Sequence, residues 1–189
     1  MWYFWPMVAS LRDTITQRLA LLYRRWAIPR VSEGVGDILG AARATMQRKR
    51  YCLLATAGDG DVDARVLQPF PPDRDFTVWL GTHRGSRKVE QIRRNPAATL
   101  AYQDDAHQAC VVLVGRMEIV EDLAARQRRF RPLWHAFWPG GPAADDFLLL
   151  RFEPNRIEVW DARRRITPAP FGLSSAKIRR GADGAWVKA

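Results

Sequence analysis

The sequence predicts a mainly β fold of the α+β type: an antiparallel barrel, closed or nearly closed, with helices at its periphery. About seven short apolar segments between residues 51 and 161 have the length and residue types of strands. Most of them are joined by turn sequences short enough for hairpins, and segments with helical spacing precede and interrupt them. A chain of 189 residues suits one such domain with extensions at its ends.

The first fifty residues are predicted to hold two helices. Residues 10–26 are amphipathic, because Ile15, Leu19 and Leu22 recur at helical spacing while arginines occupy other positions. We expect this helix to pack against the main domain or a partner subunit, and a membrane surface is the alternative. A second helix is expected over about residues 33–47. Residues 1–30 are therefore interpreted as a basic, amphipathic N-terminal extension.

The strands are predicted within a central domain that covers residues 31–161. Gly58-Asp59-Gly60-Asp61 has hairpin chemistry, and Glu153-Pro154-Asn155 is predicted to separate the last two strands. A further helix is expected to open at Glu121-Asp122 and run to about residue 131. Residues 162–189 form a basic tail that is expected to be extended or partly disordered. The expected strands are 51–56, 62–70, 76–80, 97–102, 109–120, 147–152 and 157–160.

The formal net charge of +10 is concentrated at the two ends of the chain. Residues 1–50 contain nine Lys/Arg and three acids, and residues 162–189 contain seven and one, so each end carries +6. The central segment carries fourteen against sixteen, or −2. Basic ends favour solubility or weak contact with anionic surfaces over a specific groove for nucleic acid.

The remaining features of the composition favour a cytoplasmic location. No apolar run approaches the roughly 20 residues that span a bilayer. The apolar opening from Trp2 to Val8 is short and lacks a preceding positive residue, so it is a poor signal peptide. Cys52 and Cys110 both lie in apolar, strand-like runs, where reduced and buried cysteines are expected.

The junction between residues 76–80 and a short helix over residues 89–94 is predicted to bind phosphate. The intervening turn, residues 81–88, gathers Thr82, Ser86, Arg87 and Lys88 near the start of that helix. Backbone N–H groups and the helix dipole favour an anion at such a position, and hydroxyls and cations would add to the attraction. The alternative is a solvated basic turn that binds nothing.

An antiparallel barrel would bring Arg65, on the preceding strand, beside this turn. The backbone of Val66 and Leu67 could then face a planar ligand at the edge of the barrel. Aromatic side chains could cover a ring system, although each tryptophan alone is more typical of a core. The candidates for that cover are Trp134, Trp138 and Trp160.

With these motifs, the sequence resembles the FMN-binding split β-barrels related to pyridoxamine 5′-phosphate oxidase, over roughly residues 35–161. The resemblance rests on an arginine-led strand, a glycine-serine-arginine-lysine turn, a glycine in the long strand and a terminal Glu-x-Trp-Asp. The last of these, with the loop from Trp138 to Pro142, looks like the general stress protein branch. The matching residues are Arg65-Val66-Leu67, Thr82, Gly85-Ser86-Arg87-Lys88, Asn95-Pro96, Gly115 and Ile157-Glu158-Val159-Trp160-Asp161.

The resemblance implies a homodimer with FMN at the subunit interface. Its phosphate would be held by Arg65, Ser86, Arg87 and Lys88, while the backbone at residues 65–67 and at Gly81 and Thr82 lines the flavin. Trp138 is included as a cofactor-binding residue. A deazaflavin is the alternative cofactor, because related barrels use it and a phosphate cluster does not discriminate.

The expected function is an FMN-dependent, NAD(P)H-using oxidoreductase of a small electrophile, linked to stress response. Two alternatives remain: a non-enzymatic flavin-binding store or sensor, and a basic protein that contacts nucleic acid or membrane through its ends. Pyridoxamine phosphate oxidation is not implied, because Gln68-Pro69-Phe70 replaces the family's lysine and no histidine follows His135. The haem-degrading relatives' C-terminal histidine is absent too. No metal ligands are expected, and no catalytic residue is assigned.

Overall fold

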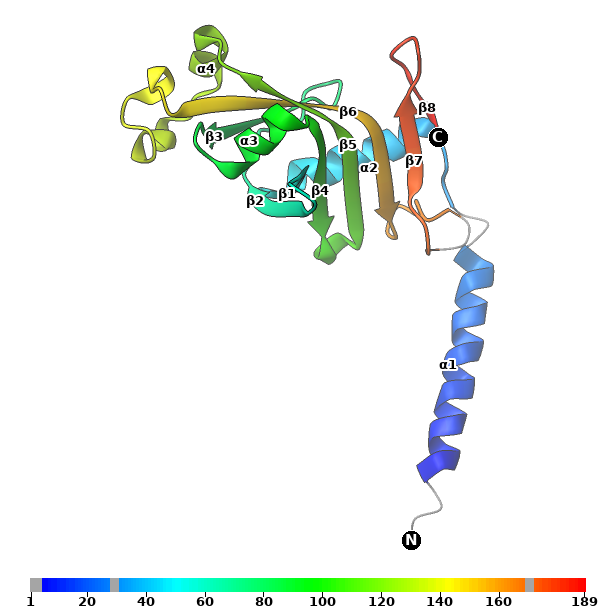
Figure 1. Ribbon diagram of the computed structural model, residues 1–189. Coiled ribbons are helices and arrows are strands. Elements are labelled where there is room, and N and C mark those ends of the chain that lie inside the picture. Colours follow the sequence, from blue (N-terminus) through cyan, green and yellow to red (C-terminus); the bar gives the residue numbers. More distant parts are fainter. Residues whose placement is uncertain (1–4, 28–30, 169–171) are drawn as a thin grey trace.

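The computed structural model of the chain describes residues 5–27, 31–168 and 172–189, with the side chains of residues 12–26 in the first range. It is a mixed α+β structure built on one eight-stranded antiparallel sheet (Figure 1). The helices are α1 Trp5–Ala27, α2 Val35–Arg48, α3 Arg87–Arg94 and α4 Leu123–Arg129, with short 3-10 turns η2 Asp105–His107, η3 Pro132–Ala136 and η4 Gly141–Ala143. The strands are β1 Cys52–Ala57, β2 Val62–Leu67, β3 Val78–His83, β4 Ala97–Asp104, β5 Ala109–Val120, β6 Phe147–Asp161, β7 Ala176–Arg180 and β8 Trp186–Lys188.

The sheet has the strand order β2-β1-β4-β5-β6-β7-β8, and β3 pairs with the first half of β6. This arrangement is the antiparallel split barrel with peripheral helices that was predicted. The sheet does not close, which corrects the expectation of a closed or nearly closed barrel. Between β2 and β3 there is an isolated bridge, Pro69 to Leu80, in place of a ladder. Proline lacks the N–H that would continue a ladder there.

The main core lies between the sheet and α2, which crosses behind the strands in Figure 1. Ile38, Ala42 and Met46 recur on one side of α2 and are almost completely buried against the strands. Cys52 belongs to this core, and burial raises the pKa of its thiol to about 12. Cys110 is half-buried, and both cysteines are free thiols, as expected.

The prediction of two strands at the end of the central domain is wrong, because β6 is one continuous strand of 15 residues. Its register against β5 shifts between Val114 and Gly115, and Pro154 pairs opposite Gly115. A Cβ atom at Gly115 would lie 2.0 Å from the carbonyl oxygen of Glu153, so this close approach of two backbones requires glycine. The bulge thus accommodates the proline without ending the strand.

The C-terminal tail also differs from its prediction. Residues 176–180 pair with β6 and residues 186–188 pair with β7, so the tail adds a hairpin to the sheet. Ala176 and Ile178 are buried in the main core. Alternating apolar and basic residues produce this strand, since Ala176 and Ile178 face inward while Lys177 and Arg179 face outward.

Strand β3 begins and ends later than predicted. Phe76 has a φ of 71°, which places it in the left-handed region and prevents an extended start at this residue. The strand therefore begins at Val78 and includes Gly81, Thr82 and His83, which had been assigned to the turn.

Helix α1 begins at Trp5 and projects away from the sheet (Figure 1). The side chains of residues 12–26 are all exposed, so this helix does not pack against the main domain as the first of the two expectations had it; packing against a partner subunit stays a prediction. The predicted end at Pro29 lies outside the described residues, and α1 ends at Ala27. Across the described ranges, no helix combines the length and apolar character needed to cross a bilayer.

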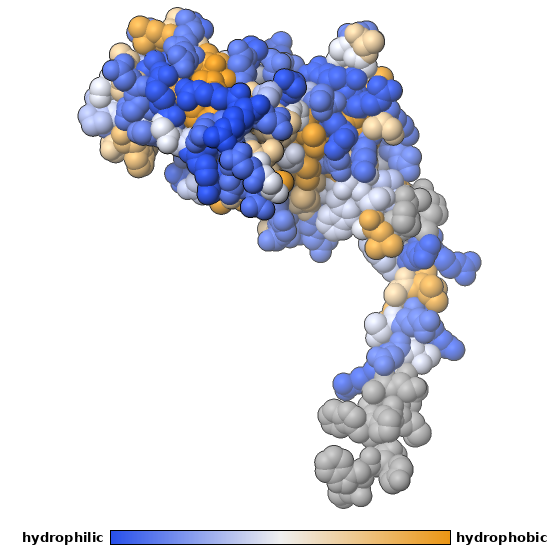
Figure 2. Space-filling view, in the orientation of Figure 1, coloured by the Kyte–Doolittle hydropathy of each residue, from blue (hydrophilic) through white to orange (hydrophobic). Residues whose placement is uncertain are grey.

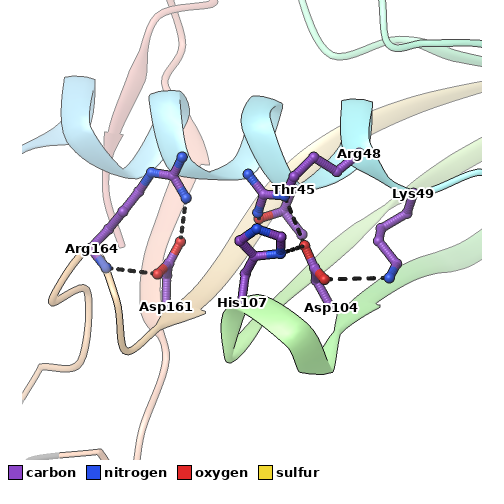
Figure 3. A network of polar contacts seen from close by, with 7 residues as sticks. All are labelled: Thr45, Arg48, Lys49, Asp104, His107, Asp161 and Arg164. Atoms are coloured by element: carbon purple, nitrogen blue, oxygen red, sulfur yellow. Dashed lines mark hydrogen bonds and ion pairs between the residues drawn. The ribbon is translucent and has the colours of Figure 1, made fainter.

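Asp104 connects the end of α2 to the end of β4 (Figure 3). Its carboxylate accepts hydrogen bonds from Arg48 Nε at 2.8 Å and from Lys49 Nζ at 3.4 Å, and His107 Nδ1 lies 3.0 Å away. The Arg48 guanidinium, followed by His107 and Lys49, holds the pKa of the buried Asp104 carboxyl well below its usual range. This network fixes the helix to the sheet.

Candidate functional site

Arg65 lies at the centre of a polar cluster between β1, β2 and α3. Its Nη1 donates to the Thr56 hydroxyl at 2.5 Å, and its Nη2 donates to Gln91 Oε1 at 2.9 Å. Gln91 also accepts from Thr56 at 2.6 Å and donates to Asp63 at 2.5 Å. Thr56 and Gln91 are buried, so these bonds fix the Arg65 guanidinium in position.

Arg87 and Lys88 bring two more cations to this cluster from the first turn of α3. Arg87 Nη2 lies 3.0 Å from Asp63 Oδ1, and Arg65 Nη2 lies 3.8 Å from Oδ2 of the same carboxylate. Lys88 has no ion pair or hydrogen bond with any residue that the structure describes. Three cations and one carboxylate leave a net charge of +2, which is the complement of a phosphate dianion.

The pKa values of two cations of the cluster, Lys88 and Arg65, are lowered. Burial lowers the pKa of Lys88, and repulsion from Arg65 lowers it further. Burial also lowers the pKa of Arg65; Asp63 opposes this shift and Arg87 adds to it. An anion at this position would relieve both effects, because it would stabilise the charged form of each cation.

Two hydroxyls lie at the start of α3. Ser86 is the N-cap residue, but its side chain makes no capping hydrogen bond within the described chain, and its Oγ lies 3.4 Å from Thr82 Oγ1. Thr82 is buried at the end of β3. The first N–H groups of a helix have no partner inside the helix, so hydroxyls and amides are available here together.

Three residues were expected to line the flavin with their backbone, and their side-chain positions point in different directions: Val66, Leu67 and Gly81. Val66 is 63% exposed on the outer face of β2, whereas Leu67 packs against the main core. Gly81 faces away from the main core, where a Cβ atom would lie 2.6 Å from Cη2 of Trp134. The absence of a side chain at Gly81 therefore admits this indole ring.

Trp138 is not brought together with the cations within one chain. It packs with Trp134 and Phe147 in a second apolar cluster. Phe147 pairs with His83, which lies on the opposite face of β3 from Thr82. The indole N–H of Trp138 is buried and has no partner among the described residues. Its assignment to the cofactor site stays a prediction.

The sequence analysis missed Thr56, Asp63 and Gln91. Asp63 lies two residues before Arg65, so both side chains occupy the same face of β2. Gln91 follows Arg87 by four residues, so the two are neighbours on α3. Both spacings could have indicated from the sequence that Asp63 and Gln91 lie beside the cations. The position of Thr56 in the cluster could not, because it depends on the pairing of β1 with β2.

The histidines do not form a second site. His83 is exposed, and its Nδ1 accepts a hydrogen bond from the N–H of Gly85 at 3.0 Å, as a solvent-facing residue would. Among the residues that the structure describes, no three His, Cys, Asp or Glu side chains are grouped to hold a metal ion.

The fold and the cluster define an antiparallel split barrel with three cations and two hydroxyls gathered at the start of α3. A family model for "Pyridoxamine 5′-phosphate oxidase like" proteins matches residues 41–182. The chain therefore belongs to the pyridoxamine 5′-phosphate oxidase-like family. No curated protein matches significantly.

Solved structures share this fold at low sequence identity. A protein related to general stress protein 26 from Clostridium acetobutylicum is 21% identical, with a TM-score of 0.61 over 70% of this chain and 92% of that one. General stress protein 26 from Bacillus anthracis is 16% identical, with a TM-score of 0.57 over 79% and 97%. A pyridoxamine 5′-phosphate oxidase-related, FMN-binding protein from Nostoc punctiforme is 17% identical, with a TM-score of 0.54 over 82% and 93%.

Proposed function

We propose that the protein binds FMN, with the phosphate held by Arg65, Arg87 and Lys88 and by the hydroxyls of Ser86 and Thr82. The observation that carries this proposal is the net +2 charge of a cluster whose guanidinium is fixed by buried partners and whose lysine has no described counter-charge. Family membership and an FMN-binding structural relative support it. A deazaflavin remains the alternative, since its phosphate would find the same cations.

A bound flavin would supply electron or hydride transfer, and the chain's residues would position it. Arg65 would contribute a donor that does not need to reorganise, because Thr56 and Gln91 already hold it. Gly81 and Thr82 would present backbone at the end of β3. We propose an NAD(P)H-dependent oxidoreductase of a small electrophile, as in a stress response, and a store or sensor of flavin is the alternative outcome.

Binding of FMN and of riboflavin, which lacks the phosphate, tests the site. We expect apo-protein to bind FMN more tightly, and the double variant Arg87→Ala/Lys88→Ala to lose most of that preference. Each charge-assisted hydrogen bond contributes about 1.5–3 kcal/mol, so FMN affinity should fall by at least about tenfold. Arg93→Ala, an exposed position near the other end of α3, is the matched control. An unchanged preference for FMN would remove the assignment.

Reduction kinetics separate an enzyme from a store. If the protein is an oxidoreductase, NADH or NADPH should bleach the flavin absorbance anaerobically, and an acceptor should restore it. A protein that binds FMN tightly but stays yellow with both donors would be a store or sensor.

We also propose that the protein is a homodimer formed through the outer face of the sheet. Leu53 and Val66 are paired across β1 and β2 and are 45% and 63% exposed, and Val62 on β2 is 73% exposed. Half-buried Ala101 and Val112 continue this apolar face over β4 and β5, and an apolar strip is visible over the middle of the sheet in Figure 2. Apolar surface of this extent favours burial against a second copy.

The double variant Leu53→Glu/Val66→Glu should be monomeric in light scattering, while the unchanged chain is dimeric. Its two positions are exposed, so the fold should persist in circular dichroism. Leu133→Glu is the control, since this residue is 84% exposed on η3 and lies outside the sheet face. A monomeric unchanged chain would refute the interface.

A further inference from the structure

Helix α1 presents an apolar stripe that the sheet domain does not cover. Ile15, Leu19 and Leu22 are 55%, 61% and 61% exposed, although they recur on one side of the helix. Figure 1 shows α1 directed away from the body, and Figure 2 shows orange and blue residues along its visible length. Covering apolar side chains arranged this way is favourable, because it removes their surface from water.

Arginines border this stripe on both sides. At about 100° per residue, Arg12 lies roughly 60° from Ile15 on one side, and Arg18 and Arg25 lie roughly 60–80° away on the other. Asp13, the one acidic residue between residues 12 and 26, lies on the far side of the helix. Cations at the two borders of an apolar stripe can extend toward phosphates while the stripe enters the apolar layer below.

More positive charge lies where α1 meets the sheet domain. Arg163 and Arg165 are exposed in the turn after β6, and the Arg165 guanidinium lies 5.5 Å from the centre of the Trp26 ring. Tyr23 and Trp26 are exposed near this end of α1. Aromatic residues of these types are enriched at the interface between lipid and water.

We propose that α1 lies on the surface of an anionic lipid bilayer and anchors the protein to it without crossing it. The charge of α1 favours a lipid surface over a second copy of α1 as the partner that covers the apolar stripe. Residues 12–26 contain four arginines and one aspartate, a net charge of +3, so two copies would bring like charges together at the borders of the stripe. An anionic surface complements that charge instead. The anchor is independent of the flavin site.

Co-sedimentation of the full chain with lipid vesicles tests the anchor. We expect binding to vesicles with about one third phosphatidylglycerol, weaker binding as salt rises, and little binding to pure phosphatidylcholine. The variant Ile15→Gln/Leu19→Gln/Leu22→Gln should lose affinity by at least about 100-fold. Arg12→Gln/Arg18→Gln/Arg25→Gln should lose about 100-fold on anionic vesicles.

The control variant Thr16→Gln/Ala20→Gln changes the same helix away from the stripe and should bind as the unchanged chain does. Thermal unfolding and FMN binding should be the same in every variant, because the anchor does not contact the sheet core. Binding that survives the glutamine substitutions in the stripe would overturn the proposal. So would equal binding to neutral vesicles, or assembly beyond the sheet dimer that the same substitutions abolish, since the stripe would then be covered by another copy.

Discussion

The indole of Trp134 lies so close to the α-carbon of Gly81 that a Cβ atom there would be 2.6 Å from Cη2 and 2.7 Å from Cζ3. The two residues connect β3 to the aromatic cluster of Phe130, Trp134, Trp138 and Phe147. Glycine is therefore required at this position by the chain's own packing, before any ligand is considered.

Gly81→Ala should destabilise the protein by about 1–3 kcal/mol, because the methyl group would displace the indole ring from a packed cluster. Chemical denaturation followed by circular dichroism measures this loss. In a double-mutant cycle with Trp134→Leu, the smaller leucine side chain should leave room for the methyl group, so Gly81→Ala should cost less stability in that background. Strictly additive effects would show that the contact is not the cause.

The affinity for FMN should fall as pH rises through the pKa of Lys88. Burial and Arg65 lower that pKa in the free protein from its usual value of 10.5, so neutral lysine forms below that pH. A bound phosphate favours the charged form, so binding is coupled to proton uptake in this range. Titrations of FMN at several pH values measure the decline.

Lys88→Arg is the matched control for this pH dependence. Arginine keeps its charge throughout the alkaline range, so the decline should be smaller or shifted to higher pH in this variant. An identical pH profile would show that another group is responsible.

Asp104→Asn should destabilise the protein by about 2 kcal/mol, because a buried carboxylate that accepts charge-assisted hydrogen bonds would be lost. The native pKa of Asp104 is lowered, so its contribution is complete above the unfolded pKa of about 3.9 and is lost as pH falls further. Unfolding measured between neutral and acidic pH should therefore show a shallower decline in the variant. Asp105→Asn, an exposed neighbour, should leave the profile unchanged.

Trp138→Phe should leave stability nearly unchanged, because the substitution removes a buried N–H that has no described partner and keeps an aromatic ring. If this N–H donates to the cofactor, FMN affinity should fall by about tenfold. Fluorescence titration measures it. Unchanged FMN affinity would remove Trp138 from the cofactor site and leave it only its packing contacts with Trp134 and Phe147.

The sequence correctly predicted those helices and strands whose bounds are determined by their own residues. Strand β5 occupies the predicted residues 109–120, where an apolar run is followed by alternating apolar and charged residues, and Asp122 caps α4 by accepting from the N–H of Ala125. The division of β6 was wrong because Pro154 is a local signal for a break, whereas the bulge that accommodates it depends on Gly115 of another strand.

The cations of the candidate site were predictable, but the contacts that fix Arg65 were not. Arg65 and Arg87 lie 3.8 Å and 3.0 Å from the same carboxylate, that of Asp63, and Lys88 is near enough to Arg65 for repulsion to lower its pKa. The buried contacts that fix Arg65 involve Thr56 and Gln91, from a strand and a helix far apart in the sequence. Such contacts follow from tertiary pairing, which no local pattern contains.

The hairpin of β7 and β8 also has a consequence for solubility. It covers the second half of β6, which would otherwise present a long row of unpaired backbone groups to other molecules. The new outermost strand, β8, has three residues and carries Lys188, so it is a poor template for adding another chain. A protein shortened before residue 176 would expose the edge of β6 to strand addition by other molecules and should aggregate. The β7–β8 hairpin therefore protects the sheet against polymerisation.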